Sequence, residues 1–203
     1  MNTPTSTKAK LAKLRPTQMT LGYAEVALKR KQWRALGAKE AREFLRAHRF
    51  PAISGPKGRL YITDHHHLGR ALQEEKVATV NVAVLADLSS LDRDEFWILM
   101  DFQQWAHPYD AQGRRRDFSS IPKNLKRLPD DPFRSLAAQV RRKGDYPKDA
   151  TPFAEFLWAD FFRRRISADE LRRDPDKALR RAKRLARSLE AAHLPGWSGI
   201  GKS

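Results

Sequence analysis

Asp64, His65, His66 and His67 form the densest group of ionisable side chains in the sequence. An imidazole can bind a metal ion, donate an N–H to a phosphate oxygen, or transfer a proton near neutral pH. Successive helical residues turn by about 100 degrees, so at most two of the three histidines can meet one ligand. Metal binding is disfavoured because no HxxxH pair, the spacing that aligns two ligands on one helix face, is present. The further imidazoles are His48, His107 and His193.

The flanking residues predict a strand that runs into a helix. Residues 59–63 are rich in β-branched and aromatic types, and the turn-forming segment 54–58 precedes them. Asp64 is expected to be the N-cap of a helix whose apolar positions include Leu68 and Leu72. The first turn of a helix presents N–H groups that favour an anion. The sequence therefore predicts an anion site here, and the alternative is an exposed polar first turn with no ligand.

Composition excludes several classes of protein. The chain has no Cys, so it forms neither a disulfide nor a thiolate metal site. It has no run of about 18 apolar residues, and its first ten residues lack the apolar stretch of a secretory signal, so we expect a cytoplasmic protein without a membrane partner. The 40 Lys and Arg against 24 Asp and Glu give a net charge of +16. Such an excess favours DNA or a nucleotide as partner, and the alternative is a solubilising charge.

Short strands and helices in mixed order predict an α+β fold. We expect strands at residues 11–15, 50–54, 59–63 and 77–88. Helices are expected at residues 20–36, 38–48, 64–76, 92–105, 131–143, 153–165 and 176–190. The predicted organisation is a flexible tail (1–10), a compact domain (11–106), a long loop (107–132), a helical extension packed on the domain (133–192) and a loose tail (193–203).

Charged residues outside the histidine group allow two interpretations each. The candidate DNA contacts are Arg114, Arg115, Arg116, Arg180, Arg181 and Arg184, and the alternative is a solvated basic face. Asp130 and Asp131 have the chemistry to hold Mg²⁺, but Asp131 also suits an N-cap before Pro132. Glu155 and Asp160 interrupt an apolar helix, where ion pairs with Arg163 or Arg164 are favoured over catalysis.

Four segments carry a resemblance to a known superfamily. The stretch DHHHLGRA at residues 64–71 resembles the D-G-H-H-R-x-x-A box of ParB/sulfiredoxin proteins. The agreement extends upstream to residues 14–18 (LRPTQ) and 51–63. Downstream, residues 130–137 and 153–160 resemble the branch of ParB-like nucleases. The resemblance covers about residues 11 to 166.

The resemblance implies a ParB/sulfiredoxin-like domain in which the box cradles nucleotide phosphates at a helix N-terminus. Relatives include CTP-binding DNA-segregation proteins, an ATP-using sulfinic-acid reductase, free-serine kinases, and bacterial plasmid proteins with nucleotidase and DNase activity. The implied catalytic residues are Asp64, His66 and His67. The implied phosphate-binding residues are Thr17, Gln18, Asp64, His65, His66, His67 and Arg70. The implied cofactors are ATP or another nucleotide, with Mg²⁺ for which Asp64 and Asp131 are candidate ligands.

The sequence departs from the family pattern at three positions. His65 replaces the box glycine, and Leu68 replaces an arginine whose charge Arg70 could supply from one turn further on. Gln18 stands where the kinase relatives have a catalytic glutamate, and a glutamine is no general base at ordinary pH. The reductase chemistry is excluded because it needs a cysteine.

The hypothesis that follows is an enzyme: a nucleotide-binding phosphohydrolase of the ATPase or DNase type. Two alternatives remain open. One is an ATP- or ADP-dependent kinase of a free amino acid, which Gln18 disfavours. The other is a non-catalytic DNA-binding protein that nucleotide switches, which the lack of a recognisable helix-turn-helix pair disfavours.

Overall fold

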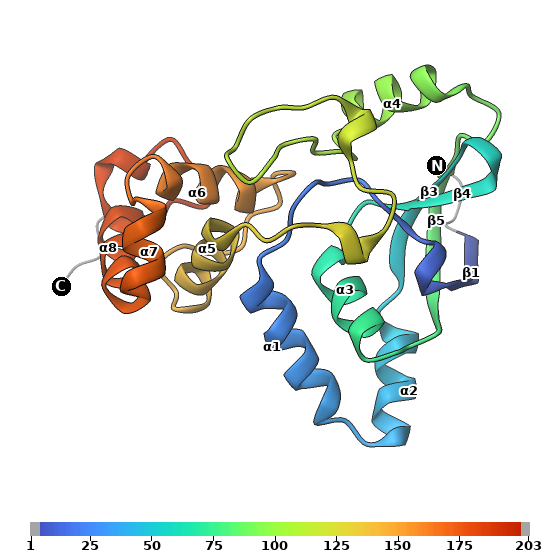
Figure 1. The fold of residues 1–203 in the computed structure, drawn as a ribbon, viewed down its shortest axis with the longest axis horizontal. Helices are drawn as coiled ribbons and strands as arrows, with labels where there is room; N and C mark the ends of the chain where they lie inside the picture. The colour runs from blue at the N-terminus through green and yellow to red at the C-terminus, as the bar shows by residue number, and fades with distance from the viewer. Residues whose placement is uncertain (1–4, 200–203) are drawn as a thin grey trace. The chain divides into compact units, whose positions relative to one another are not determined.

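The computed structural model describes residues 5–199 and divides into two compact units (Figure 1). Residues 5–21 and 25–129 form the first unit, and residues 22–24 and 130–199 form the second. Residues 1–4 and 200–203, which belong to the two predicted tails, lie outside the described residues. None of the helices within residues 5–199 has the length and apolar character that a membrane span requires.

The first unit is built on a mixed five-stranded sheet, so the fold is α+β as predicted. Its strands are β1 (Thr5–Lys10), β5 (Thr79–Asp87), β3 (Phe50–Gly55), β4 (Arg59–Ile62) and β2 (Arg15–Pro16), given in spatial order. β1 pairs antiparallel with β5, and β3 pairs antiparallel with β4. β5 with β3 and β4 with β2 are parallel pairs.

The start of the chain corrects the sequence prediction. Residues 5–10, which composition assigns to a flexible tail, form edge strand β1 along β5. A polar Thr/Ser/Lys segment can take this place because an edge strand needs only backbone pairing and keeps its side chains in water. Of the predicted strand at residues 11–15 only Arg15 lies in a strand, β2, because residues 11–13 form a 3₁₀ turn, η1, that buries Leu11.

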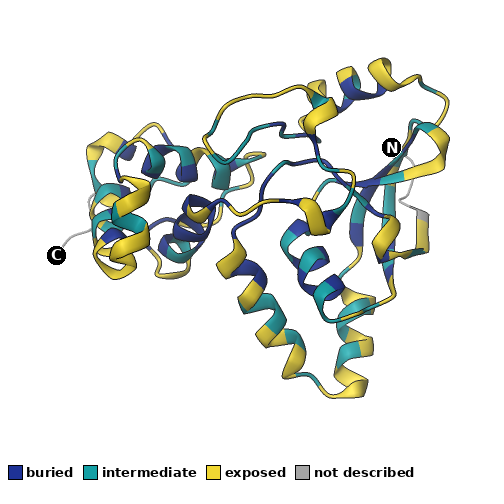
Figure 2. Ribbon diagram, viewed as in Figure 1, coloured by how far each residue is buried: buried dark blue, intermediate teal, exposed yellow. Residues whose placement is uncertain are grey.

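Helices cover both faces of the sheet. On one face α3 (His66–Glu74) packs over Phe50 and Ile62, together with side chains from α1 (Tyr23–Arg34) and α2 (Ala38–Ala47). On the other face α4 (Arg93–Phe102) packs its Phe96 over Ile53 and Tyr61. Neighbouring strand residues such as Tyr61 and Ile62 thus enter opposite cores, as strand alternation requires. Figure 2 shows the buried strands between the two layers.

The predicted long loop, residues 107–132, is irregular apart from two 3₁₀ turns, η3 (Phe118–Ser120) and η4 (Leu125–Arg127). Leu125 is fully buried beneath α3, and Ile121 is buried in the core beside α4. The loop is therefore anchored on both faces of the sheet by apolar side chains.

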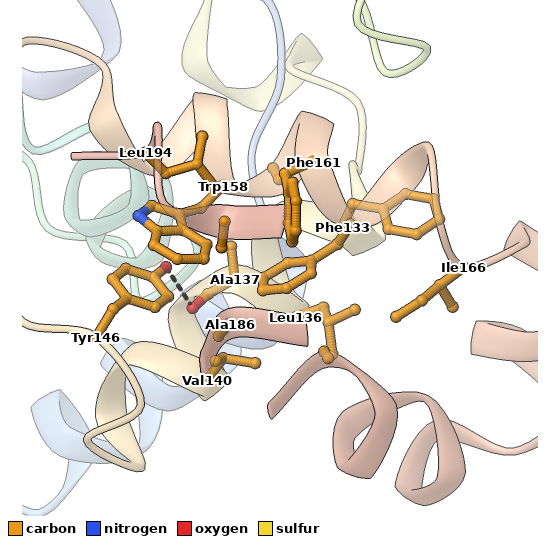
Figure 3. Packing of buried hydrophobic residues seen from close by; sticks show 14 of the residues in the cluster. Phe133, Leu136, Ala137, Val140, Tyr146, Trp158, Phe161, Ile166, Ala186 and Leu194 are labelled. Carbon is orange, nitrogen blue, oxygen red and sulfur yellow. Dashed lines mark hydrogen bonds between the residues drawn. The ribbon is translucent and has the colours of Figure 1, made fainter. Parts of the chain in front are cut away.

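The second unit consists of helices around one aromatic core. They are α5 (Pro132–Arg142), α6 (Ala154–Arg163), α7 (Ala168–Arg173), α8 (Pro175–Arg187) and the 3₁₀ turn η5 (Leu189–Ala191). Trp158 is fully buried and stacks on Tyr146, with ring centroids 4.0 Å apart. The Tyr146 hydroxyl donates to the carbonyl of Ala137 at 2.8 Å (Figure 3). Helix α6 is central to this core, as its apolar circumference predicts.

Two details of this unit differ from the sequence prediction. Helix α8 ends at Arg187 and buries Ala178, Ala182 and Ala186, whereas Leu189 lies beyond the helix and is 68% exposed. Small residues at i, i+4 and i+8 lie on one face of the helix and let it approach its neighbours closely. The short helix α7 was not predicted.

The predicted loose tail is ordered as far as it is described. Leu194 is buried in the aromatic core. Trp158 Nε1 donates to the carbonyl of Pro195 at 2.9 Å, and Trp197 Nε1 donates to the carbonyl of Ser188 at 3.0 Å. The side chains of Leu194 and Trp197 therefore anchor this segment to the second unit.

Candidate functional site

The strand-to-helix junction is longer than predicted, because the strand ends one residue earlier and the helix begins later. β4 ends at Ile62 and α3 begins at His66, with three residues between them. The N-cap position belongs to His65, so the prediction that Asp64 is the N-cap is wrong. The Asp64 carboxylate instead accepts the His65 N–H, at 2.6 Å from Oδ1. Asp64 thus lies one residue before the N-cap position of α3.

The backbone of His65 explains why the box of the family has glycine at this position. His65 adopts φ 65° and ψ 22°, in the left-handed region. Glycine enters this region without strain, and other L-residues pay about 1–2 kcal/mol. Histidine is among the side chains found there more often than average. The departure at His65 therefore retains the turn at a cost in strain.

His66 is a buried link between α3 and the short strand β2. Its side chain lies inside the fold with the residue 4% exposed, and Nε2 accepts the backbone N–H of Thr17 at 3.1 Å. A ring nitrogen that accepts a hydrogen bond carries no proton, so the neutral ring has its proton on Nδ1. Thr17 in turn donates from Oγ1 to the carbonyl of Ile62 at 2.9 Å. His66 thus fixes Thr17 against the end of β4.

Gln18 brings a fourth histidine to the site. Gln18 is 6% exposed, and its Nε2 donates to the carbonyl of Thr20 at 2.7 Å. Its backbone forms a parallel bridge with His107, whose N–H donates to the carbonyl of Thr17 at 2.8 Å. The His107 ring stacks on Tyr109 with centroids 4.4 Å apart. Sequence reasoning missed this role of His107, because no local pattern shows which strand a loop residue will pair with.

Asp64 and His67 occupy the accessible side of the junction. The Asp64 side chain is 73% exposed, and His65 and His67 are half-buried. The His65 ring meets Phe50 edge-on, with centroids 5.7 Å apart. The three histidines therefore divide between interior and surface, as helix rotation predicts.

Arg70 is held by the chain itself. Its Nε contacts Glu74 Oε1 at 2.6 Å, and one terminal nitrogen donates to the carbonyl of Lys126 at 2.7 Å. The same nitrogen lies 3.3 Å from the carbonyl of Leu125. The guanidinium clamps η4 onto α3, so a phosphate would have to share it with these acceptors.

Asp131 belongs to the second unit and caps α5, as predicted. It is 2% exposed, accepts the Phe133 N–H at 3.1 Å and pairs with Arg163 at 2.6 Å. Burial raises the pKa of Asp131, while Arg163 opposes that shift. Burial also raises the pKa of Asp130, which accepts the Tyr23 N–H at 2.7 Å. Within residues 5–199 no three His, Asp or Glu side chains are grouped to hold a metal ion.

The acidic residues of α6 are ion-paired. Asp160 pairs with Arg163 at 3.0 Å and with Arg164 at 2.8 Å, as the helical spacing predicts. Glu155 pairs with Arg141 of α5, a partner that the spacing within α6 does not reveal.

The two candidate DNA-binding groups differ in their own contacts. Arg114 and Arg116 pair with Asp110, and Arg115 pairs with Asp101. On α8, Arg181 pairs with Glu170 at 2.7 Å. Arg180 and Arg184 are exposed and form no ion pair within the part of the chain that the structure describes.

Comparison with known proteins places the fold. The family model described as "Putative ParB-like nuclease" matches residues 7–164. The crystal structure of protein Atu1540 from Agrobacterium tumefaciens is similar, with 48% sequence identity and a TM-score of 0.90. The similarity covers 98% of this chain and 100% of that one. No functionally curated protein matches. The chain belongs to the ParB-like nuclease family.

Proposed function

We propose that the protein is a phosphohydrolase, of the nuclease or nucleotidase type, that binds a nucleotide phosphate where β4 meets α3. The observation that carries this proposal is the turn at His65, held from below by the bond between His66 Nε2 and the Thr17 N–H. The turn places the N-terminus of α3 directly after β4. The N–H groups in the first turn of a helix point out of its N-terminus, towards the end of the preceding strand here. This arrangement favours an anion.

The proposed roles follow from exposure and existing bonds. His67, half-buried at the surface, donates to the phosphate or transfers a proton to the leaving oxygen. Asp64, whose side chain is largely exposed, orients the attacking water. His66 acts as a positioning residue, since its Nε2 is already an acceptor within the fold. Thr17 and Gln18 form the side of the site next to His66.

The site offers one accessible carboxylate for Mg²⁺, that of Asp64. Magnesium commonly binds through one or two carboxylates together with substrate phosphates and water. Asp64 is the carboxylate that would hold it, and the ion would neutralise phosphate charge. Asp131 is an unsuitable second ligand, because its oxygens already serve the α5 cap and Arg163.

DNA is the proposed macromolecular substrate, given the net charge of +16 and the family. Arg180 and Arg184 on α8 suit phosphate contacts best, because both are exposed and neither is ion-paired within residues 5–199. Arg114, Arg115 and Arg116 would have to exchange carboxylate partners for DNA phosphates.

A kinase acting on a free amino acid receives no support from the site. Gln18 stands in the position of the catalytic glutamate, and its amide is hydrogen-bonded to the chain. Gln18 therefore has a structural role and does not supply the general base that a kinase would need.

The experiment measures phosphate release from ATP and cleavage of single- and double-stranded DNA, with Mg²⁺ or Mn²⁺. We expect Asp64→Asn and His67→Gln each to lower the rate by at least about 100-fold, the usual effect of losing acid–base assistance. His193→Gln is the matched control, because His193 is exposed in the second unit, and it should retain the wild-type rate. Absence of hydrolysis by the wild type on every substrate would overturn the proposal.

A further inference from the structure

We infer a second anion-binding site in the first unit, in a basic pocket on the α4 side of the sheet. The pocket has a volume of about 290 Å³ and lies where the β3–β4 turn, β2, α4 and the η3 segment meet. This size is at the small end of the range for ligand pockets. It suits a few linked phosphate groups rather than a large organic molecule.

The charge of the lining is one-sided. Five cationic side chains line the pocket and no carboxylate does: Arg15, Lys57, Arg59, Arg93 and Lys123. Asp92 and Glu95, at the start of α4, are not among the lining residues and engage each other's backbone in the helix cap. Cations gathered around a concave surface concentrate positive potential there.

These five cations differ from the ion-paired arginines of the first unit, as do Arg42 and Arg46 on α2. None of them forms an ion pair within residues 5–199. Elsewhere in the first unit Arg30, Arg34 and Arg70 are bound to glutamates, and the loop arginines 114–116 are bound to aspartates. Unpaired like charges repel each other, so placing five together destabilises the fold unless an anion offsets them.

The floor of the pocket is rigid and aromatic. Phe96 is fully buried, Tyr61 is 8% exposed and Trp97 is 9% exposed. Phe118 stacks on Trp97 with ring centroids 5.2 Å apart and an interplanar angle of 3°. Because these rings already pack on one another, the ligand is held by charge at the rim rather than by stacking.

The pocket is separate from the junction site. It takes Arg59 from the N-terminal end of β4 and Lys57 from the turn before this strand, and the histidine box follows the C-terminal end. The three residue steps of β4, from Arg59 to Ile62, span about 10 Å, and the box begins beyond Ile62. The two sites therefore do not share one phosphate group.

The ligand that fits is a chain of linked phosphates. Two sources carry this chemistry, a free oligophosphate and the backbone of a single-stranded nucleic acid. For a nucleic acid the site would hold the strand at a distance from the junction, with sequence-independent and salt-sensitive affinity.

The experiment measures binding of sodium tripolyphosphate, and separately of a fluorescent single-stranded oligonucleotide, to the full chain. The test variant is Arg59→Gln/Arg93→Gln/Lys123→Gln, and the matched control is Lys39→Gln/Arg42→Gln/Arg46→Gln on α2. All six side chains are exposed and both variants lose three charges from the first unit. Thermal unfolding midpoints equal to that of the wild type verify that both variants fold.

The inference predicts that at least one ligand binds the wild type and that its affinity falls at least 10-fold in the test variant, against less than 2-fold in the control. If the oligonucleotide is the ligand, the slope of log K against log salt becomes shallower by about 2, because three contacts each contribute about 0.7. Tripolyphosphate binding alone identifies a free oligophosphate as ligand. Equal losses in the two variants, or binding of neither ligand, overturn the inference. Neither result depends on hydrolysis at the junction.

Discussion

Asp64 and Asp131 look alike in the sequence and differ in the structure. Each stands just before a helix, and each has the chemistry of a metal ligand or a cap. The Asp131 side chain is 2% exposed, accepts a backbone N–H and pairs with Arg163, whereas the Asp64 side chain is 73% exposed and accepts the N–H of its neighbour His65. The comparison shows that the residue type alone allows several roles, and that burial and hydrogen-bond partners determine which role a residue has.

The same contrast separates the two units. In the second unit the acidic residues that resembled catalytic candidates, Glu155 and Asp160, are ion-paired around α6. In the first unit His66 is tied to Thr17, while His67 and Asp64 stay near the surface. We therefore expect catalysis at the polar side chains of the first unit that lie near the surface, rather than at the ion-paired acids of α6.

The largest expected difference in stability is between the two aspartates. Asp131→Ala removes a buried cap and ion pair, and should lower the free energy of unfolding by about 3 kcal/mol. Asp64→Ala should change it by less than about 0.5 kcal/mol, because the side chain is exposed. Denaturation in urea checks both. Similar losses in the two variants would contradict the distinction.

The two adjacent histidines provide the next comparison. His66→Ala leaves the buried Thr17 N–H without its acceptor, which should cost about 2 kcal/mol. His67→Ala should cost less than about 0.5 kcal/mol, since His67 is half-buried at the surface. The same denaturation measurement applies, and a more destabilising change at His67 would show that His66 is not the structural member of the pair.

The strain at His65 gives a smaller effect. His65→Gly should be more stable than His65→Ala by about 1 kcal/mol, because alanine is strained at φ 65° and glycine is not. Comparing the two variants with each other removes the loss of the imidazole from the result. Alanine proving the more stable of the two would mean that the turn is not left-handed in solution.

Glu75, at the C-terminal end of α3, differs from both aspartates because it is paired with two arginines. Hydrogen bonds and charge from Arg34 and Arg30 lower its pKa from the ordinary 4.5 to about 2. A depressed folded-state pKa contributes stability that is present above pH 4.5 and lost as the pH falls towards 2. Glu75→Gln should therefore flatten the decrease in melting temperature over this range. An unchanged acid profile would show that the pairs of Glu75 with Arg30 and Arg34 contribute nothing measurable to stability.

Much of the fold was predictable because local chemistry determines it. Pro132 after Asp131 predicts the start of α5, and the acidic turn around Asp92 predicts the start of α4; the structure confirms both. Strand β1 was missed because a polar edge strand has no apolar pattern to detect. The order of residues 193–199 was missed because it depends on long-range bonds to Trp158 and Ser188.

The candidate site was predictable in place but not in detail. The histidine box located the junction of β4 and α3. The N-cap is His65 rather than Asp64, and this was missed because no local sequence pattern predicts a histidine in the left-handed conformation. The pairing of Gln18 with His107 joins residues far apart in the chain, and only tertiary structure brings them together. The clamp between Arg70 and residues 125–126 is of the same kind.

The most direct test of the central claim is histidine NMR during nucleotide titration. The protein is labelled at its six histidines, and ATP with Mg²⁺ is added to the wild type and to Asp64→Ala. A phosphate site at the junction predicts that the His65 and His67 signals move in a saturable way, that His193 does not, and that Asp64→Ala weakens the response. Signals at His65 and His67 that stay fixed at saturating ATP, CTP and DNA would contradict the account.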